Sequence, residues 1–148
     1  MLFVRLSGGI TWNRYRANTM TVLMFDRCFE GKIRDGTKCL TIRGPRKRSI
    51  HGGDQLSLRC WSGKPYRSKQ LSILETCCHH VCDIVLRDDA IYFTGESVAK
   101  QETVYWASLS RKVVARANGF CSWKAMIDHH KKRGASFPFS GTLIEWEV

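Results

Sequence analysis

The sequence predicts an α+β domain in which several strands form a curled sheet and two or three helices flank it. Three observations lead to this fold class. Apolar residues alternate along residues 55–61, an extended stretch runs from residue 70 to residue 86, and the spacing becomes helical in the second half of the chain. With 148 residues, 43% of them hydrophobic, the chain is long enough to bury one core of its own.

The first elements are a strand, a short helix and a second strand. The apolar run 21–25 predicts the first strand. Asp26 is a suitable N-cap for the helix that follows, and Gly36 is a suitable end for it. The apolar face of this helix is predicted to consist of Phe29 and Ile33. Residues 38–43 then alternate as a strand does.

Two more strands and a long extended stretch follow. Residues 51–54 predict a turn because they contain two glycines and an aspartate. Residues 55–61 then alternate cleanly, so we expect a strand with one buried face. The residues predicted to point inward are Leu56, Leu58 and Cys60. Residues 70–86 are predicted to be extended, and residues 91–93 begin a further apolar segment.

The second half predicts two helices and a closing strand. The N-caps are predicted to be Ser108 or Ser110 for the first helix and Ser122 for the second. The first helix is expected to end at Asn118-Gly119, and the second at Gly134, because these residues tolerate a positive φ. Residues 142–148 alternate as a final strand does.

The start of the chain differs from the remainder. Residues 1–19 have no clear period and no acidic residue, so we expect them to be an N-terminal extension, upstream of the natural start or disordered, with the domain itself at residues 20–148. An extra strand packed on the sheet is the alternative. No apolar run approaches the roughly 20 residues that span a bilayer, and no membrane partner is expected.

Charge and cysteine content indicate the kind of protein and its partners. The chain carries 24 Lys and Arg against 13 Asp and Glu, a net charge of +11, and such a field attracts polyanions. Its seven cysteines are odd in number and no secretory signal is evident, which predicts reduced thiols in the cytoplasm. No cofactor is predicted.

A cysteine- and histidine-rich run at residues 77–82 contains the residue types that bind zinc. On an extended strand, neighbouring side chains point to opposite faces, so these ligands converge poorly on one ion. No second Cys-x-x-Cys pair follows. We therefore predict no metal and interpret the cysteines as small buried thiols.

The segment 43–69 is the most basic part of the chain, with eight Lys or Arg against one acid. Trp61 and Tyr66 are interleaved with these cations. Cations hold phosphates and aromatic faces stack on bases, a combination that suits single-stranded or looped RNA. The alternative is a solvated loop with Trp61 in the core. The predicted RNA contacts in this segment are Arg43, Arg46, Lys47, Arg48, Trp61, Lys64, Tyr66 and Arg67.

Four segments carry a resemblance to a known family. Residues 36–43 read Gly-Thr-Lys-Cys-Leu-Thr-Ile-Arg and residues 53–56 read Gly-Asp-Gln-Leu. Residues 115–126 place an Asn-Gly-Phe turn between two helices, and residues 143–146 read Leu-Ile-Glu-Trp. In this order they resemble the ASCH domain family of the PUA-like superfamily over residues 20–148. The resemblance implies a PUA-like β-barrel with two or three flanking helices and a cleft, and related domains bind RNA.

The resemblance also implies roles for individual residues. Some bacterial ASCH proteins are similar to an amidohydrolase that removes the acetyl group of N4-acetylcytidine with a Lys-x-x-Thr pair and an acid. Lys38 and Thr41 match the pair, and Asn118 stands at the position of the acid. An amide is no general base, and Asn-Gly is also simply a good helix end.

Three interpretations of these residues stay open. Thr41 could be a nucleophile with Lys38 as its base, Lys38 and Arg43 could hold a phosphate with help from Thr41, or all three could face water on a half-exposed strand. Our first hypothesis is a basic cleft that holds RNA or a modified nucleoside, floored by these residues and closed by Asn118. The alternatives are an amidohydrolase acting on an N4-acylated cytidine-type nucleoside or a ribonuclease in the same cleft, and a module that binds an acidic protein.

Overall fold

A computed structural model describes residues 20–94 and 111–148 and confirms the predicted α+β class. The elements are β1 (Thr21–Phe25), the 3-10 turn η2 (Arg27–Phe29), α1 (Glu30–Arg34), β2 (Leu40–Arg43), β3 (Gln55–Trp61), β4 (Gln70–Leu86), β5 (Ile91–Thr94), α3 (Arg111–Ala117), α4 (Trp123–Lys132) and β6 (Phe139–Trp146). The predictions for residues 1–19, Ser108 and Ser110 lie outside the described residues.

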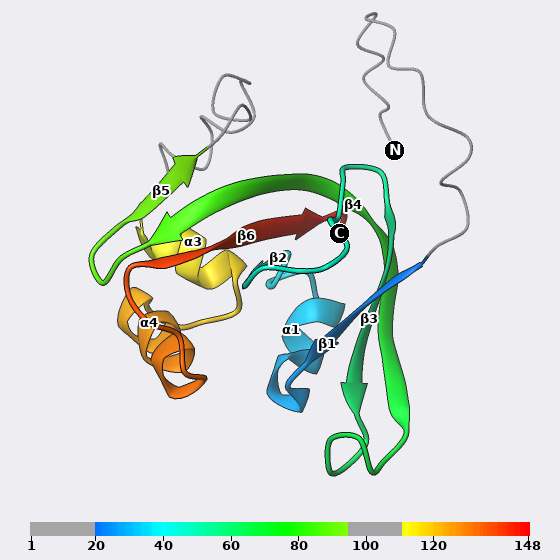
Figure 1. The fold of residues 1–148 in the computed structure, drawn as a ribbon. Helices are drawn as coiled ribbons and strands as arrows, with labels where there is room; N and C mark the ends of the chain where they lie inside the picture. Colours follow the sequence, from blue (N-terminus) through cyan, green and yellow to red (C-terminus); the bar gives the residue numbers. More distant parts are fainter. Residues whose placement is uncertain (1–19, 95–110) are drawn as a thin grey trace, which may run out of the picture.

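The strands form one curled, mixed sheet in the order β1-β3-β4-β6-β2, with β5 also paired to β4. β1 and β3 are parallel and the other pairs are antiparallel. The 17-residue β4 belongs to both halves, because it pairs with β3 up to Cys77 and with β6 from Cys78 onward. A register shift between Cys78 and His80 marks the change of partner, and Figure 1 shows β4 bending over the molecule.

The closed barrel that we expected is not formed by the described residues. Within them, no backbone ladder pairs β1 with β2, so both remain edges of an open sheet. A side chain bridges the gap instead: Nη2 of Arg43, at the end of β2, donates to the carbonyl oxygen of Met24 in β1 at 2.6 Å. A side chain takes more room than a backbone ladder, which leaves space between the two edges.

Two clusters of buried residues form the core. The first core cluster packs β1, β3 and the start of β4 against α1 and includes Leu23, Phe29, Ile33, Leu56, Leu58, Cys60 and Trp146. The second packs β2, β6 and the end of β4 against α3 and α4 and includes Leu40, Ile42, Ile84, Val114, Met126 and Leu143. The predicted inward face of β3 is confirmed, because all three of its residues are fully buried. Figure 1 shows α1 beside β1, apart from α3 and α4.

The predicted helix ends are partly confirmed. Ser122 caps α4, and its Oγ accepts from the backbone nitrogen of Ala125 at 3.1 Å. Gly119 and Gly134 follow α3 and α4 with φ of 89° and 84°, as expected of glycine at a helix end. Asp26 was predicted to cap the first helix, but its side chain makes no capping bond. Its carboxylate pairs with Arg133 instead.

The run 77–82 lies within β4, where Cys78 and Cys82 are buried free thiols. Burial raises the pKa of each to about 12. In residues 20–94 and 111–148, no group of three or more His, Cys, Asp or Glu is placed to hold a metal ion. None of the helices in these ranges is both long and apolar enough to cross a membrane.

Candidate functional site

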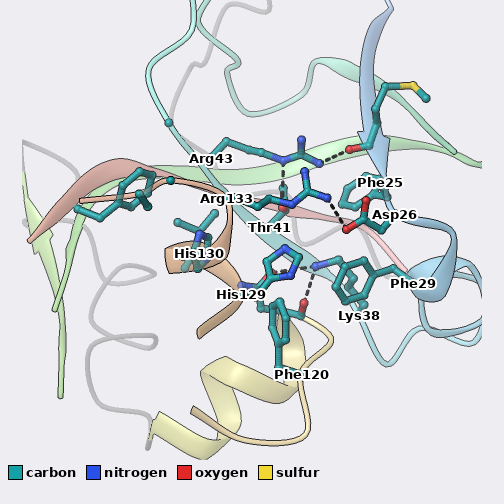
Figure 2. A pocket seen from close by; sticks show the side chains of 17 residues that line it. Phe25, Asp26, Phe29, Lys38, Thr41, Arg43, Phe120, His129, His130 and Arg133 are labelled. Atoms are coloured by element: carbon teal, nitrogen blue, oxygen red, sulfur yellow. Dashed lines mark hydrogen bonds and ion pairs between the residues drawn. The ribbon is translucent and has the colours of Figure 1, made fainter. Parts of the chain in front are cut away.

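A cavity of about 360 Å³ lies between the two core clusters, within the size range of small-molecule sites. It opens between the β1–η2 segment on one side and the end of α4 on the other, with β2 at its floor (Figure 2). Four of the residues singled out in the sequence line it: Lys38, Thr41, Arg43 and Asn118. Aromatic side chains form much of the wall, namely Phe25, Phe29, Phe120, His129, His130 and Phe139.

Lys38 lies between α1 and β2, and only 2% of it is exposed. Its Nζ donates to the carbonyl oxygen of Leu40 at 2.9 Å, to the carbonyl oxygen of Asn118 at 2.5 Å and to Oδ1 of Asn118 at 2.8 Å. Three oxygens match the three protons of an ammonium group. Nζ also lies 4.8 Å from the centre of the Phe29 ring, a cation–π distance. Lys38 therefore fastens the turn after α3 to the start of β2.

Opposing effects act on the protonation of Lys38. Burial, the largest cause, and the charge of Arg43 lower the pKa of Lys38 from 10.5 to about 7. The three oxygen acceptors favour the ammonium form and limit how readily it loses its proton. Lys38 is thus a buried group whose charge is held by hydrogen bonds rather than by a carboxylate.

This lowered pKa predicts a pH dependence of stability. Between the folded value of about 7 and the ordinary value of 10.5, the unfolded chain binds the proton more tightly, so the free energy of unfolding rises with pH. We expect this contribution of Lys38 between about pH 7 and about pH 8.5, where the unfolded cysteines begin to ionise and oppose it equally in the wild type and in a Lys38 variant. Urea unfolding at both pH values should show it as a steeper rise with pH in the wild type than in the variant. Lys38→Met should remove it, and equal slopes for both proteins would contradict the assignment.

Asn118 ends α3 and turns its side chain toward Lys38. Its backbone nitrogen donates to the carbonyl oxygen of Val114 at 3.0 Å, and this bond closes the last turn of that helix. Because Oδ1 accepts from Lys38, the side chain of Asn118 can donate only through the two protons of Nδ2. No hydrogen bond occupies Nδ2 in the part of the chain that the structure describes. Asn118 therefore offers donors at the cavity wall, and its orientation is fixed by a buried cation.

Thr41 and Arg43 project from β2 into the same cavity. Nε of Arg43 donates to Oγ1 of Thr41 at 3.2 Å, and its guanidinium lies 4.7 Å from the centre of the Phe25 ring. Burial lowers the pKa of Arg43 to about 10, with the charge of Arg46 as a smaller cause, so it stays charged at neutral pH. Among the described residues, no hydrogen bond joins Lys38 to Thr41. The nucleophile–base contact that catalysis would use is not formed.

Asp26 supplies a carboxylate at the cavity that sequence reasoning missed. It follows β1, lines the cavity, and forms an ion pair with Arg133, which follows α4. Figure 2 shows the pair beside Arg43 and above Lys38. The two residues are 107 positions apart in the sequence, so no local sequence pattern predicts their contact.

His129 and His130 add neutral rings to the wall. The His129 ring lies edge-on to Phe29 at 6.0 Å and tilted over Phe120 at 5.0 Å, and the His130 ring lies 5.6 Å from Phe139. Burial is the main reason that the pKa of His129 is lowered and that of His130 falls to about 4. The two histidines precede the basic residues 131–133, and in the sequence this run equally suits the C-terminal end of a helix.

The other predicted contacts lie elsewhere. Arg46, Lys47 and Arg48 are exposed in the loop after β2, and Arg46 lines a second cavity of about 610 Å³ with residues of β4 and β6. The remaining predicted contacts belong to the hairpin between β3 and β4, namely Trp61, Lys64, Tyr66 and Arg67. None of these seven lines the first cavity. The structure thus divides the predicted set among three places.

Comparison with known proteins assigns no family or activity to this site. No protein-family model matches the chain, and neither a curated protein nor a solved structure does. The chemistry of the cavity is therefore interpreted from its own residues. Its wall consists of neutral rings, and its charged groups are the cations Arg43 and Arg133 and the carboxylate of Asp26. Within the described residues, the Asn118 amide and the Thr41 hydroxyl also have protons that no hydrogen bond uses.

Proposed function

We propose that this chain is an ASCH-type RNA- or nucleotide-binding domain whose cavity holds one nucleoside unit. The observation that carries the proposal is the contact of Lys38 Nζ with Oδ1 of Asn118, which makes the Asn118 amide a donor toward a ligand. Nucleobases present carbonyl oxygens and ring nitrogens that accept such bonds. A buried cation that holds one amide in one orientation suits recognition better than it suits general packing.

The remaining wall fits the other parts of a nucleotide. The rings of Phe29, Phe120 and His129 suit the faces of a base, because base–aromatic stacking is a common means of holding unpaired nucleotides. Arg43 and Arg133 suit a phosphate, and Arg43 is held in place by Thr41 and Met24. The net charge of +11 favours encounter with a polyanion over encounter with a neutral metabolite.

Asn118→Asp tests the proposal with little change of shape. The variant keeps an oxygen for Lys38 and removes the Nδ2 donors, so binding should weaken while the fold remains. We expect cytidine 5′-monophosphate to bind about 10-fold to 100-fold more weakly, the usual value of a paired base contact. Titration calorimetry measures it, with Asp128→Asn on the exposed side of α4 as control. Unchanged affinity in Asn118→Asp would overturn the proposal.

A second candidate function is hydrolysis of an N4-acylated cytidine-type nucleoside. It is favoured by Asp26, a carboxylate at the same cavity as Lys38 and Thr41. Against it, Arg133 pairs with Asp26, and the hydrogen bonds of Lys38 and Thr41 go to other partners. Release of acetate from N4-acetylcytidine by the wild type, abolished in Asp26→Asn, would establish this candidate. Acetate release gained only in Asn118→Asp would show that the wild-type chain lacks the acid.

A further inference from the structure

The hairpin between β3 and β4 ends in an ordered loop rather than a loose one. The backbone nitrogen of Ser62 donates to the carbonyl oxygen of Lys69 at 2.8 Å, which closes its base. The Ser68 hydroxyl accepts from the backbone nitrogen of Gly63 at 2.9 Å and donates to the carbonyl oxygen of Lys64 at 2.8 Å. The tip, residues 61–69, therefore holds its side chains in defined positions.

Tyr66 occupies a turn position that ordinarily takes glycine or asparagine. The backbone nitrogen of Arg67 donates to the carbonyl oxygen of Lys64 at 3.2 Å, Pro65 is the second residue of the turn, and Tyr66 has a φ of 63°. This is the pattern of a type II turn, whose third residue needs a positive φ. Among the described residues other than glycine, Tyr66 is the one with positive φ.

Core packing does not compensate this strain, because Tyr66 is 90% exposed. A small residue such as glycine would relieve the strain in this turn. An exposed aromatic residue at this position therefore indicates a role for the ring itself. The ring is not isolated, since its centre lies 5.2 Å from that of Trp61 at the hairpin base. Trp61 thus contacts the Tyr66 ring and leaves most of the Tyr66 side chain to solvent.

The surroundings of the ring are cationic. Lys64, Arg67 and Lys69 are exposed within the tip, which contains no Asp or Glu. Phosphates pair with such cations, and an unpaired base stacks on an exposed ring, so the two features together fit single-stranded nucleic acid. A duplex would present phosphates but no free base face.

The tip is connected to the rim of the cavity. Nη1 of Arg27 donates to the carbonyl oxygen of Ser62 at 3.0 Å, and Arg27 directly follows Asp26, which lines the cavity. Figure 1 shows the hairpin extending past α1 and β1, on the side of the molecule away from α3 and α4. An RNA strand that leaves the cavity at Asp26 would therefore meet Arg27 and then the tip.

We propose that the tip is a second contact for single-stranded RNA, where a base that flanks the nucleoside in the cavity stacks on Tyr66. This inference rests on the proposed function of the cavity. Lys64 and Arg67 contact the phosphates of that flanking segment, and the Arg27–Ser62 contact fixes the tip relative to the rim. The cavity selects one nucleoside, and the tip adds affinity only for a ligand long enough to reach it.

Tyr66→Gly tests this contact because it removes the ring and also relieves the turn. Stability should not fall, since glycine accepts a positive φ. Affinity for a short oligocytidylate, measured by fluorescence anisotropy, should fall about 10-fold, the order expected for one lost base–aromatic stack. Tyr66→Phe should retain it. An oligomer affinity that is unchanged in Tyr66→Gly, or that falls as far in Tyr66→Phe, would overturn the inference.

The wild type and Tyr66→Gly also distinguish a failure of this inference from a failure of the function proposed for the cavity. Cytidine 5′-monophosphate is too short to span both contacts, so Tyr66→Gly should bind it as the wild type does. If the mononucleotide fails to bind the wild type, the proposed function fails. If it binds but the oligomer is insensitive to Tyr66→Gly, only the tip contact fails. Equal competition by duplex RNA of the same length would also overturn it, because a duplex has no unpaired base to stack.

Discussion

Gly119→Ala is expected to lower the free energy of unfolding by about 3 kcal/mol, the sum of a left-handed backbone penalty and an overpacked core. Gly119 has a φ of 89°, and a Cβ there would lie 2.9 Å from Cδ of Lys38 and 3.0 Å from Cδ1 of Phe29. Both neighbours are buried and held by other contacts, so neither can move away freely. The variant should also lose nucleotide binding, because the displaced Lys38 no longer orients Asn118.

Gly134→Ala is the matched control for Gly119→Ala. Gly134 has nearly the same φ, 84°, but a Cβ there would meet no atom within 4 Å. Its cost should be the backbone penalty alone, about 1 kcal/mol. Urea unfolding of both variants separates the two contributions. Equal losses of unfolding free energy would show that Gly119 is needed only for its backbone conformation, and that close packing against Lys38 does not contribute.

Arg43→Met should be the second most damaging change, because Arg43 bridges the two unpaired edges of the sheet. The variant removes the bonds to Thr41 and Met24 while a flexible apolar side chain still covers Phe25. Loss of hydrogen bonds from a charged donor should lower the free energy of unfolding by about 2 kcal/mol. Affinity for cytidine 5′-monophosphate should fall about 10-fold with the lost phosphate contact.

Arg46→Met provides the comparison for Arg43→Met, since it removes the same charge three residues away. Arg46 is exposed and does not line the first cavity. Its effect on the free energy of unfolding should stay within about 0.5 kcal/mol, as for most surface substitutions. Denaturation and calorimetry on the two variants measure both quantities. A larger loss of mononucleotide affinity in Arg46→Met than in Arg43→Met would place the ligand in the second cavity.

The strands and helix ends were predictable because their signals are local. The alternation in β3 and the serine cap of α4 follow from spacing and turn chemistry alone. The openness of the sheet was not predictable in this way. Among the described residues, the Arg43 side chain joins β2 to β1 where a closed barrel would have a backbone ladder, and a sequence pattern does not distinguish a paired strand edge from a bridged one.

The candidate site was predictable only where a motif marked it. Lys38 and Thr41 lie three residues apart, and the family resemblance added Asn118, which the structure brings to the same cavity. Asp26 and Arg133 escaped prediction because their contact arises from packing the β1–η2 segment against the end of α4. The sequence indicated a loop with RNA contacts around Tyr66, but the strained turn escaped prediction because tyrosine is an unusual residue for a positive φ.

The most direct test of the central claim follows the histidine ring resonances by NMR while cytidine 5′-monophosphate is added. His129 and His130 line the first cavity, whereas His51 lines the second. If the nucleotide binds where we propose, the His129 and His130 signals shift in a saturable way and the His51 signal stays in place. A saturable shift of His51 alone, or no shift of any histidine at saturating nucleotide, would contradict it.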